Sequence, residues 1–203
     1  MSQKKKDQER SSDKIMHAAM DVIAREKISG ARMRHIAEEA KMSQGILHYY
    51  FNTKKELLSR LLDYILFLFR QERDSDFASS DGTPPSKMHA FFEEKKRSIQ
   101  DRKLEYIQFD FWVQGTTDPE LREKIQKSYR NWRYNLYEVI QEGVDNGVFR
   151  ADRAEGVPAL TVSLLMGASA QFLIDEKAFN LDEYLASAEE MILEYLKVDS
   201  GQP

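Results

Sequence analysis

Apolar residues recur at spacings of three and four positions along most of the chain, and this spacing predicts α-helices. In the first sixty residues it predicts helices over residues 12–27, 32–40 and 43–51, with a fourth starting at Thr53. Strict alternation of apolar and polar residues never lasts for more than a few positions, so we expect no strand. The fold class that follows is all-α, with about nine helices.

Capping residues mark the ends of these short helices. Ser43 is a good N-cap for the third helix, and Thr53 with Glu56 forms a capping box at the fourth. Helical spacing then divides the third helix into two faces. Its inward face should hold Ile46, Leu47 and Phe51, and its outward face Gln44, Gly45, His48 and Tyr49.

Two short helices separated by a tight turn form a helix-turn-helix over about residues 33–52. The second helix of such a unit has the width of the DNA major groove. Gln44 can pair with adenine or a phosphate, and Gly45 lets the backbone approach DNA closely. His48 and Tyr49 have polar-tipped rings that suit phosphate or thymine-methyl contacts. The pattern therefore predicts a DNA-reading head.

The remaining chain reads as a helical trunk. The fourth helix is apolar on nearly every side over residues 65–69, and residues 75–86 form a loop with glycine and proline breakers. A fifth helix follows, and residues 104–113 are apolar nearly all round, so we expect a central buried helix there. Asp118 caps a long helix that ends before Gly147.

The last two predicted helices, over residues 154–175 and 181–196, have apolar and small residues suited to close helix packing. Paired with a second copy they would make a four-helix bundle. The alternative is that they only close the core of the monomer. The candidate dimer residues are Leu160, Leu164, Gly167, Ala168, Leu185, Ala188 and Ile192.

Aromatic residues in the trunk exceed what simple packing requires, and a few polar residues lie beside them. Such a mixture is typical of a ligand pocket. A large ligand with aromatic or acyl parts suits these side chains better than a sugar or a metal ion. The candidate ligand-binding residues are Phe67, Phe109, Asp110, Trp112, Tyr129, Trp132, Arg133 and Phe172.

Charge is distributed unevenly along the chain. Residues 1–60 contain 13 Lys or Arg and 8 Asp or Glu, a net charge of +5. The remaining residues contain 17 and 26, a net charge of −9, which accounts for the total of −4. A basic first third on an acidic body is expected of a DNA-binding head on a trunk that does not bind DNA.

Other function classes are not indicated by the composition. The chain has no cysteine, which excludes disulfides and thiolate metal sites and fits a cytoplasmic location. The most apolar stretch, residues 57–69, contains Ser59, Arg60 and Asp63, so we expect no membrane span. The four histidines lack metal-binding spacing, and no phosphate-binding glycine loop or serine nucleophile motif occurs. We therefore expect neither an enzyme nor a cofactor or metal.

Residues 12–58 resemble the DNA-binding domain of the TetR family of bacterial transcriptional repressors. Three positions differ from the pattern of that family: Arg32 replaces a capping threonine, Lys41 replaces the turn glycine, and His48 replaces the tyrosine that is common after the leucine. The matching residues are Ile36, Ala37, Ser43, Gly45, Leu47, Tyr50, Phe51, Lys54, Glu56 and Leu57.

The resemblance implies a division into a disordered basic tail (1–10), a helix-turn-helix domain (11–58), an effector-binding and dimerisation domain (59–197) and a tail (198–203). Lys54 and the free N–H groups of the fourth helix would form a phosphate-binding corner. The residues expected to meet DNA are Arg32, Arg34, Ser43, Gln44, Gly45, His48, Tyr49 and Lys54.

The function expected from these features is a sequence-specific, homodimeric repressor that an unidentified small-molecule effector releases from its double-stranded DNA operator. No membrane partner is expected. The alternative is an all-helical ligand carrier or scaffold in which the helix-turn-helix is only structural.

Overall fold

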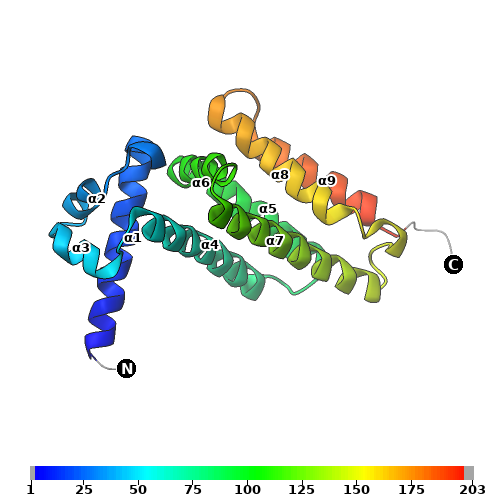
Figure 1. Cartoon of the computed structure of the whole chain (residues 1–203). Helices are drawn as coiled ribbons and strands as arrows, with labels where there is room; N and C mark the ends of the chain where they lie inside the picture. Colours follow the sequence, from blue (N-terminus) through cyan, green and yellow to red (C-terminus); the bar gives the residue numbers. More distant parts are fainter. Residues whose placement is uncertain (1–2, 199–203) are drawn as a thin grey trace. The chain divides into compact units, whose positions relative to one another are not determined.

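The computed structural model describes the backbone of residues 3–198 and the side chains from residue 10 onward (Figure 1). Within that part of the chain there are nine α-helices, one short 3-10 helix and no strand, which confirms the all-α prediction. The helices are α1 (Gln3–Gly30), α2 (Met33–Glu39), α3 (Gln44–Tyr50), α4 (Lys54–Ser79), α5 (Pro84–Gln100), α6 (Arg102–Gly115), α7 (Pro119–Asp145), α8 (Val157–Ile174) and α9 (Leu181–Leu196), with the 3-10 helix η1 at Ala151–Arg153.

The termini differ from the sequence prediction on one side. Of the tail predicted to be disordered over residues 1–10, residues 3–10 form the first turns of α1, and residues 1–2 lie outside the described residues. Residues 3–10 are mostly lysine, glutamine, glutamate and arginine, which all favour helix, and they contain no glycine or proline. The predicted tail at 198–203 lies outside the described residues except for Val198.

Polar side chains cap the helices where the sequence predicts them. The Ser43 hydroxyl accepts the N–H of Ile46 (3.2 Å), and the Thr53 hydroxyl accepts the N–H of Glu56 (3.1 Å). Asp118 accepts two backbone N–H groups at the start of α7. These bonds satisfy N–H groups that have no partner within the helix.

The chain forms two compact units. Unit 1 comprises the residues up to Leu68 together with Tyr106–Ile125, and unit 2 comprises Phe69–Glu105 and the residues from Gln126 onward. This division differs from a boundary at residue 59, because α4 continues without a break past that point and most of α6 belongs to unit 1.

Unit 1 has a core of apolar side chains at the interface of its short helices. Ile15, Val22 and Ile23 of α1 are buried together with Ile36 of α2 and Leu47 of α3. Figure 1 shows α2 and α3 beside α1, and α2 packs against both of the others. This core fixes the angle between α2 and α3 and turns the remaining face of α3 to solvent.

Unit 2 is built on the packing of α5, α8 and α9 against one another. Phe91 and Phe92 of α5 are buried, and α8 and α9 run side by side in Figure 1, joined by a short loop. The expectation that α6 is buried nearly all round is wrong: Ile107 and Phe111 are buried, but Val113 is exposed. The apolar residues of α6 that pack inward are therefore spaced four apart, on one face of the helix.

Helix α8 is long and strongly apolar. By length and composition it could cross a membrane, and it is the one helix of the described residues that could, with 44% of it buried inside the chain. Serine, threonine, glycine and glutamine interrupt its apolar residues without adding charge, so it has no long unbroken run of apolar residues.

Candidate functional site

The turn between α2 and α3 forms without glycine. Lys41 adopts a left-handed conformation (φ 52°), and the N–H of Met42 donates to the carbonyl of Ala37 (2.9 Å). A non-glycine residue in this conformation costs about 1–2 kcal/mol. The lysine that stands at the position of the family's glycine therefore takes up the backbone geometry of glycine and adds an exposed cation to the turn.

The solvent-facing side of α3 holds the residues that the sequence places there. Gln44, Gly45, His48 and Tyr49 are exposed, and the Tyr49 side chain is 77% exposed. Its ring meets Tyr50 edge to face at 5.4 Å between centroids. A helix with this much uncovered side-chain surface has the form of a major-groove reading helix.

Ile46 is a correction, because the sequence assigns it to the inward face. It is 48% exposed, whereas its neighbour Leu47 is fully buried. With only seven residues, α3 buries one narrow stripe, and Leu47 fills it. Ile46 is thus an apolar side chain on the reading face, where it can contact a thymine methyl group. Apolar residue type alone does not distinguish the exposed Ile46 from the buried Leu47.

The predicted cationic contacts divide into two groups. Arg32 and Arg34 are exposed beside α2, and Arg34 lies 3.5 Å from Glu38. Lys54 is half-buried, and its Nζ donates to the carbonyl of Ile28 at 2.5 Å. Burial lowers the pKa of Lys54, although the Asp110 carboxylate opposes this. The lysine expected to bind phosphate therefore points towards the end of α1.

The eight candidate ligand-binding residues do not form one cluster within a unit. Four of them lie in unit 1 and four in unit 2. Phe67 is 49% exposed, Phe109 and Trp112 form an edge-to-face pair at 5.0 Å, and Asp110 accepts the N–H of Ile28 at 2.5 Å. Asp110 was expected to orient a ligand, but its carboxylate is bonded to the backbone of α1.

Unit 2 contains a buried polar cluster around Glu105. This carboxylate is 1% exposed and accepts hydrogen bonds from Lys95 (2.7 Å), Ser98 (2.5 Å) and Ser169 (2.5 Å). Burial and the Glu105 charge raise the pKa of Tyr129 above its usual range. Sequence periodicity does not predict this cluster. It places Glu105 at the edge of an apolar stretch but gives no information about its partners Lys95, Ser98 and Ser169.

The indole of Trp132, also in unit 2, has a buried N–H without a hydrogen-bond partner among the described residues. Buried polar groups in proteins nearly always have a partner. Of the eight candidate ligand residues, Trp132 is the one whose buried side-chain donor has no partner within the described part of the chain.

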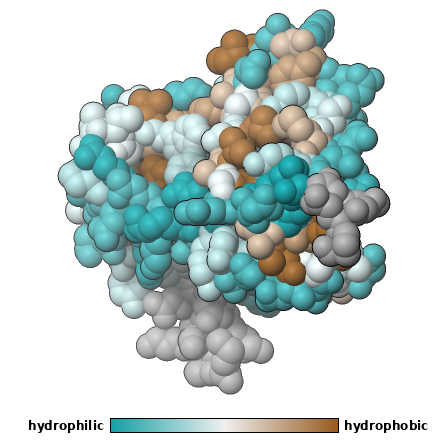
Figure 2. Space-filling model, turned by 90° about the vertical axis from the view of Figure 1, so that its right-hand side faces the viewer, coloured by the Kyte–Doolittle hydropathy of each residue, from teal (hydrophilic) through white to brown (hydrophobic). Residues whose placement is uncertain are grey.

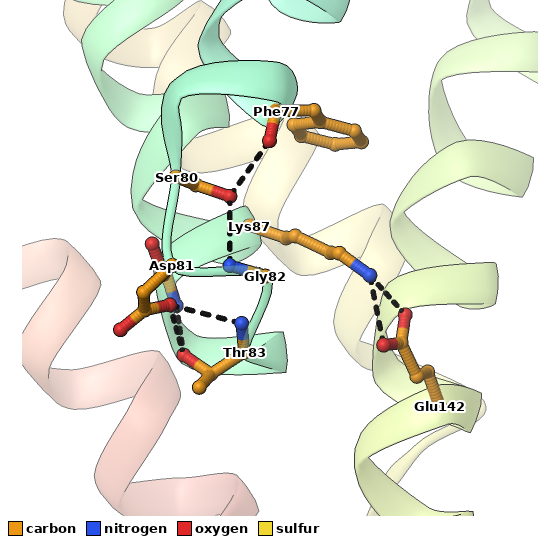
Figure 3. A network of polar contacts seen from close by, with 8 residues as sticks. Phe77, Ser80, Asp81, Gly82, Thr83, Lys87 and Glu142 are labelled. Atoms are coloured by element: carbon orange, nitrogen blue, oxygen red, sulfur yellow. Dashed lines mark hydrogen bonds and ion pairs between the residues drawn. The ribbon is translucent and has the colours of Figure 1, made fainter.

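A pocket of about 630 Å³ also lies in unit 2, between the end of α4, the start of α5 and the end of α7. Lys87 crosses it to Glu142, with Nζ 2.8 and 2.7 Å from the two carboxylate oxygens, beside the loop that Asp81 and Thr83 stabilise (Figure 3). None of the candidate ligand residues is among the described residues lining it, which are Arg73, Asp74, Phe77, Lys87, Asn135, Glu138, Val139, Gln141, Glu142, Asp145 and Asn146.

The candidate dimer residues are only partly available at the surface. Ala168, Leu185, Ala188 and Ile192 are buried, because α5 and α8 cover the face of α9 that carries the last three. These three residues of α9 are therefore part of the core of the chain. Hydrophobic side chains also reach the surface in separate patches, some visible in Figure 2. The exposed residues of this kind on α8 and α9 are Leu160, Ile174, Met191 and Tyr195, while Leu164 and Gly167 are half-buried.

Two protein families match the chain. Residues 15–61 match the bacterial regulatory proteins of the tetR family, and residues 89–197 match the C-terminal domain of BetI-type transcriptional repressors. Together the two matches cover the helix-turn-helix and most of the trunk.

Similar proteins and solved structures are also transcriptional regulators. The chain is 24% identical to the HTH-type transcriptional repressor KstR2 of Mycolicibacterium smegmatis over 142 residues, which cover 69% of this chain and 68% of that protein. The fold of this chain is similar to that of a transcriptional regulator from Saccharomonospora viridis solved in complex with choline (TM-score 0.83, 20% identity, 94% of this chain and 100% of that chain). It is also similar to FadR from Bacillus subtilis in complex with stearoyl-CoA (TM-score 0.77, 18% identity, 90% and 98%).

Proposed function

The chain belongs to the TetR family and is a transcriptional repressor rather than an enzyme, and from this premise we propose that it acts as a homodimer that a small-molecule effector releases from its operator. The exposed reading face of α3, fixed by the buried core of unit 1, carries the proposal. A carrier or scaffold with a purely structural helix-turn-helix is not favoured by these matches. A cytoplasmic location agrees with the proposed function.

In the proposed complex α3 lies in the major groove. Gln44, Ile46 and Tyr49 meet base edges, and Gly45 allows close approach of the backbone. His48 and the hydroxyl of Ser43 lie at the margins of the same face. The exposed cations Arg32, Arg34 and Lys41 contact phosphates on either side of the groove.

The proposed dimer forms through the outer faces of α8 and α9. Leu160 is 54% exposed and Ile174 is 87% exposed on a helix that is apolar on all sides. Met191 and Tyr195 of α9 are also exposed. A second copy that covers these side chains explains the apolar surface of α8 without a membrane. It also supplies the second head that a two-half-site operator requires.

The effector is proposed to bind in unit 2. The unpaired indole N–H of Trp132 supports this location. Solved structures of similar fold contain choline in one case and stearoyl-CoA in another, so the chemistry of ligands varies among the relatives. Effector and operator would weaken each other's binding by the same factor, which for a coupling of about 1–3 kcal/mol is roughly 5–150-fold.

A matched pair of tyrosine variants tests the proposed reading face. The probe is the duplex that the purified protein enriches from a random-sequence library. Tyr49→Ala should weaken binding to it at least about tenfold, the size of one lost base contact. Tyr134→Ala, which removes an exposed tyrosine on α7, should leave binding within about twofold of the parent, since Tyr134 belongs to unit 2 and lies outside the helix-turn-helix. Equal affinities for the two variants in fluorescence anisotropy would contradict the proposal.

A further inference from the structure

One residue near the end of α1 has a backbone conformation that side chains rarely permit. Lys27 has φ 64° and ψ 164°, inside a run of otherwise helical residues. This region of backbone space belongs almost entirely to glycine, and a residue with a side chain there costs about 1–3 kcal/mol. Such a conformation persists only when the surrounding structure holds it.

Side chains of α4 and α6 contact the backbone and side chain at this non-helical point of α1. Because Lys27 leaves the helical path, the N–H of Ile28 donates to Oδ2 of Asp110 on α6, at 2.5 Å. The carbonyl of Ile28 accepts from Nζ of Lys54 on α4, also at 2.5 Å. The ammonium of Lys27 lies over the ring of Tyr106, 4.4 Å from its centroid. Tyr106 and Asp110 are four residues apart, so both project from one face of α6.

We propose that Asp110 is a positioning residue for operator binding: through the N–H and the carbonyl of Ile28 it ties α6 to Lys54 and so to the first turn of α4. That turn follows α3 after only three residues, Phe51 to Thr53. Asp110 thereby sets how the start of α4 and the end of α3 lie against α1. The inference rests on the proposed DNA-binding function.

Helix α6 also gives Asp110 a connection to unit 2 through the chain. Residues 102–105 of α6 belong to unit 2 and the rest to unit 1. Glu105, five residues before Asp110, is held by Lys95, Ser98 and Ser169. Five residues of helix span about 7.5 Å. Asp110 and Glu105 therefore lie close together along one continuous helix.

Two substitutions separate the hydrogen bond from the charge. Asp110→Asn keeps an oxygen acceptor for the N–H of Ile28 and removes the charge, whereas Asp110→Leu removes both. For the duplex enriched by the parent, Asp110→Leu should weaken binding about tenfold and Asp110→Asn no more than about threefold, as loss of the acceptor for a part-buried donor implies. The dependence of affinity on salt should not change in either variant, because Asp110 touches no phosphate.

A double-mutant cycle with Lys54→Met tests whether Asp110 acts through Ile28 and Lys54. The double variant with Asp110→Leu should bind no more weakly than the weaker single variant, since both break the same chain of contacts. Hydrogen exchange at the amide of Ile28 should become faster in Asp110→Leu and stay near the parent rate in Asp110→Asn. A role in stability alone would not produce this pairing of exchange and affinity. If circular dichroism shows that Asp110→Leu does not fold, Asp110→Ala takes its place with the same expectations.

The outcomes distinguish this inference from the proposed function. If the parent enriches no duplex, both fail. If the parent enriches a duplex and Asp110→Leu binds it as tightly as the parent does, only the inference fails. It fails equally if Asp110→Leu and Asp110→Asn strengthen binding to every duplex alike, because Asp110 would then act only by repelling phosphates.

Discussion

At the scale of single residues, the structure reassigns side chains whose type gives no indication of their partner. Lys54 caps the end of α1, Asp110 accepts a backbone N–H, and Ile46 is exposed on α3. A lysine after a recognition helix suits phosphate and a helix C-terminus equally well. The choice depends on the break at Lys27, which helical periodicity does not indicate.

Glu94 of α5 gives a prediction about stability and pH. Burial raises its pKa to about 7, against the opposing charges of Arg73 and Lys95, from an ordinary value of 4.5. Between these pH values the folded protein holds a proton that the unfolded chain has released. Stability should therefore fall as the pH rises from 5 to 7, by about 2 kcal/mol from this group.

Urea unfolding at pH 5 and pH 7 measures this contribution. Glu94→Gln should lose clearly less stability than the parent over that interval, because glutamine does not titrate. Glu190→Gln, a change at an exposed position of α9, serves as the control and should behave as the parent does. The same pH dependence in Glu94→Gln and in the parent would refute the assignment.

At the scale of elements, periodicity and capping predict the helices well, because both depend on neighbours in sequence. The starts of α4 and α7 follow from Thr53 and Asp118, whose side chains make the expected bonds. The covering of a helix face depends instead on distant segments. The apolar residues Leu185, Ala188 and Ile192 of α9 suit a dimer contact and a monomer core alike, and contact with α5 and α8 places them in the core. The prediction of the ligand residues depends on aromatic content, which carries no information about the two units.

The outer face of α8 gives the prediction at this scale. Leu160→Glu should leave a folded monomer, because it places a charge in the proposed dimer contact and not in the core. Leu185→Ala should instead destabilise the folded chain by about 2–5 kcal/mol, since Leu185 is buried. Sedimentation velocity and thermal melts separate these effects. A Leu160→Glu protein that still sediments as a dimer would exclude this face as the dimer contact.

At the scale of the whole molecule, the net charge of −4 is the sum of a basic first sixty residues (+5) and an acidic remainder (−9). The cations of unit 1 that remain exposed around α2 and the turn are Arg32, Arg34 and Lys41. Two heads of a dimer would bring six such groups to one duplex. The sequence indicates this asymmetry directly, since it needs only the order of the charges along the chain.

The salt dependence of binding to the enriched duplex tests most directly whether the α3 face and the cations beside it bind DNA. Each neutralised phosphate contributes about −0.9 to the slope of log affinity against log salt concentration. Six contacts therefore predict a slope of about −5, together with a preference for the enriched duplex over a scrambled one at every salt concentration. A slope near zero, with equal affinity for the two duplexes, would contradict the account.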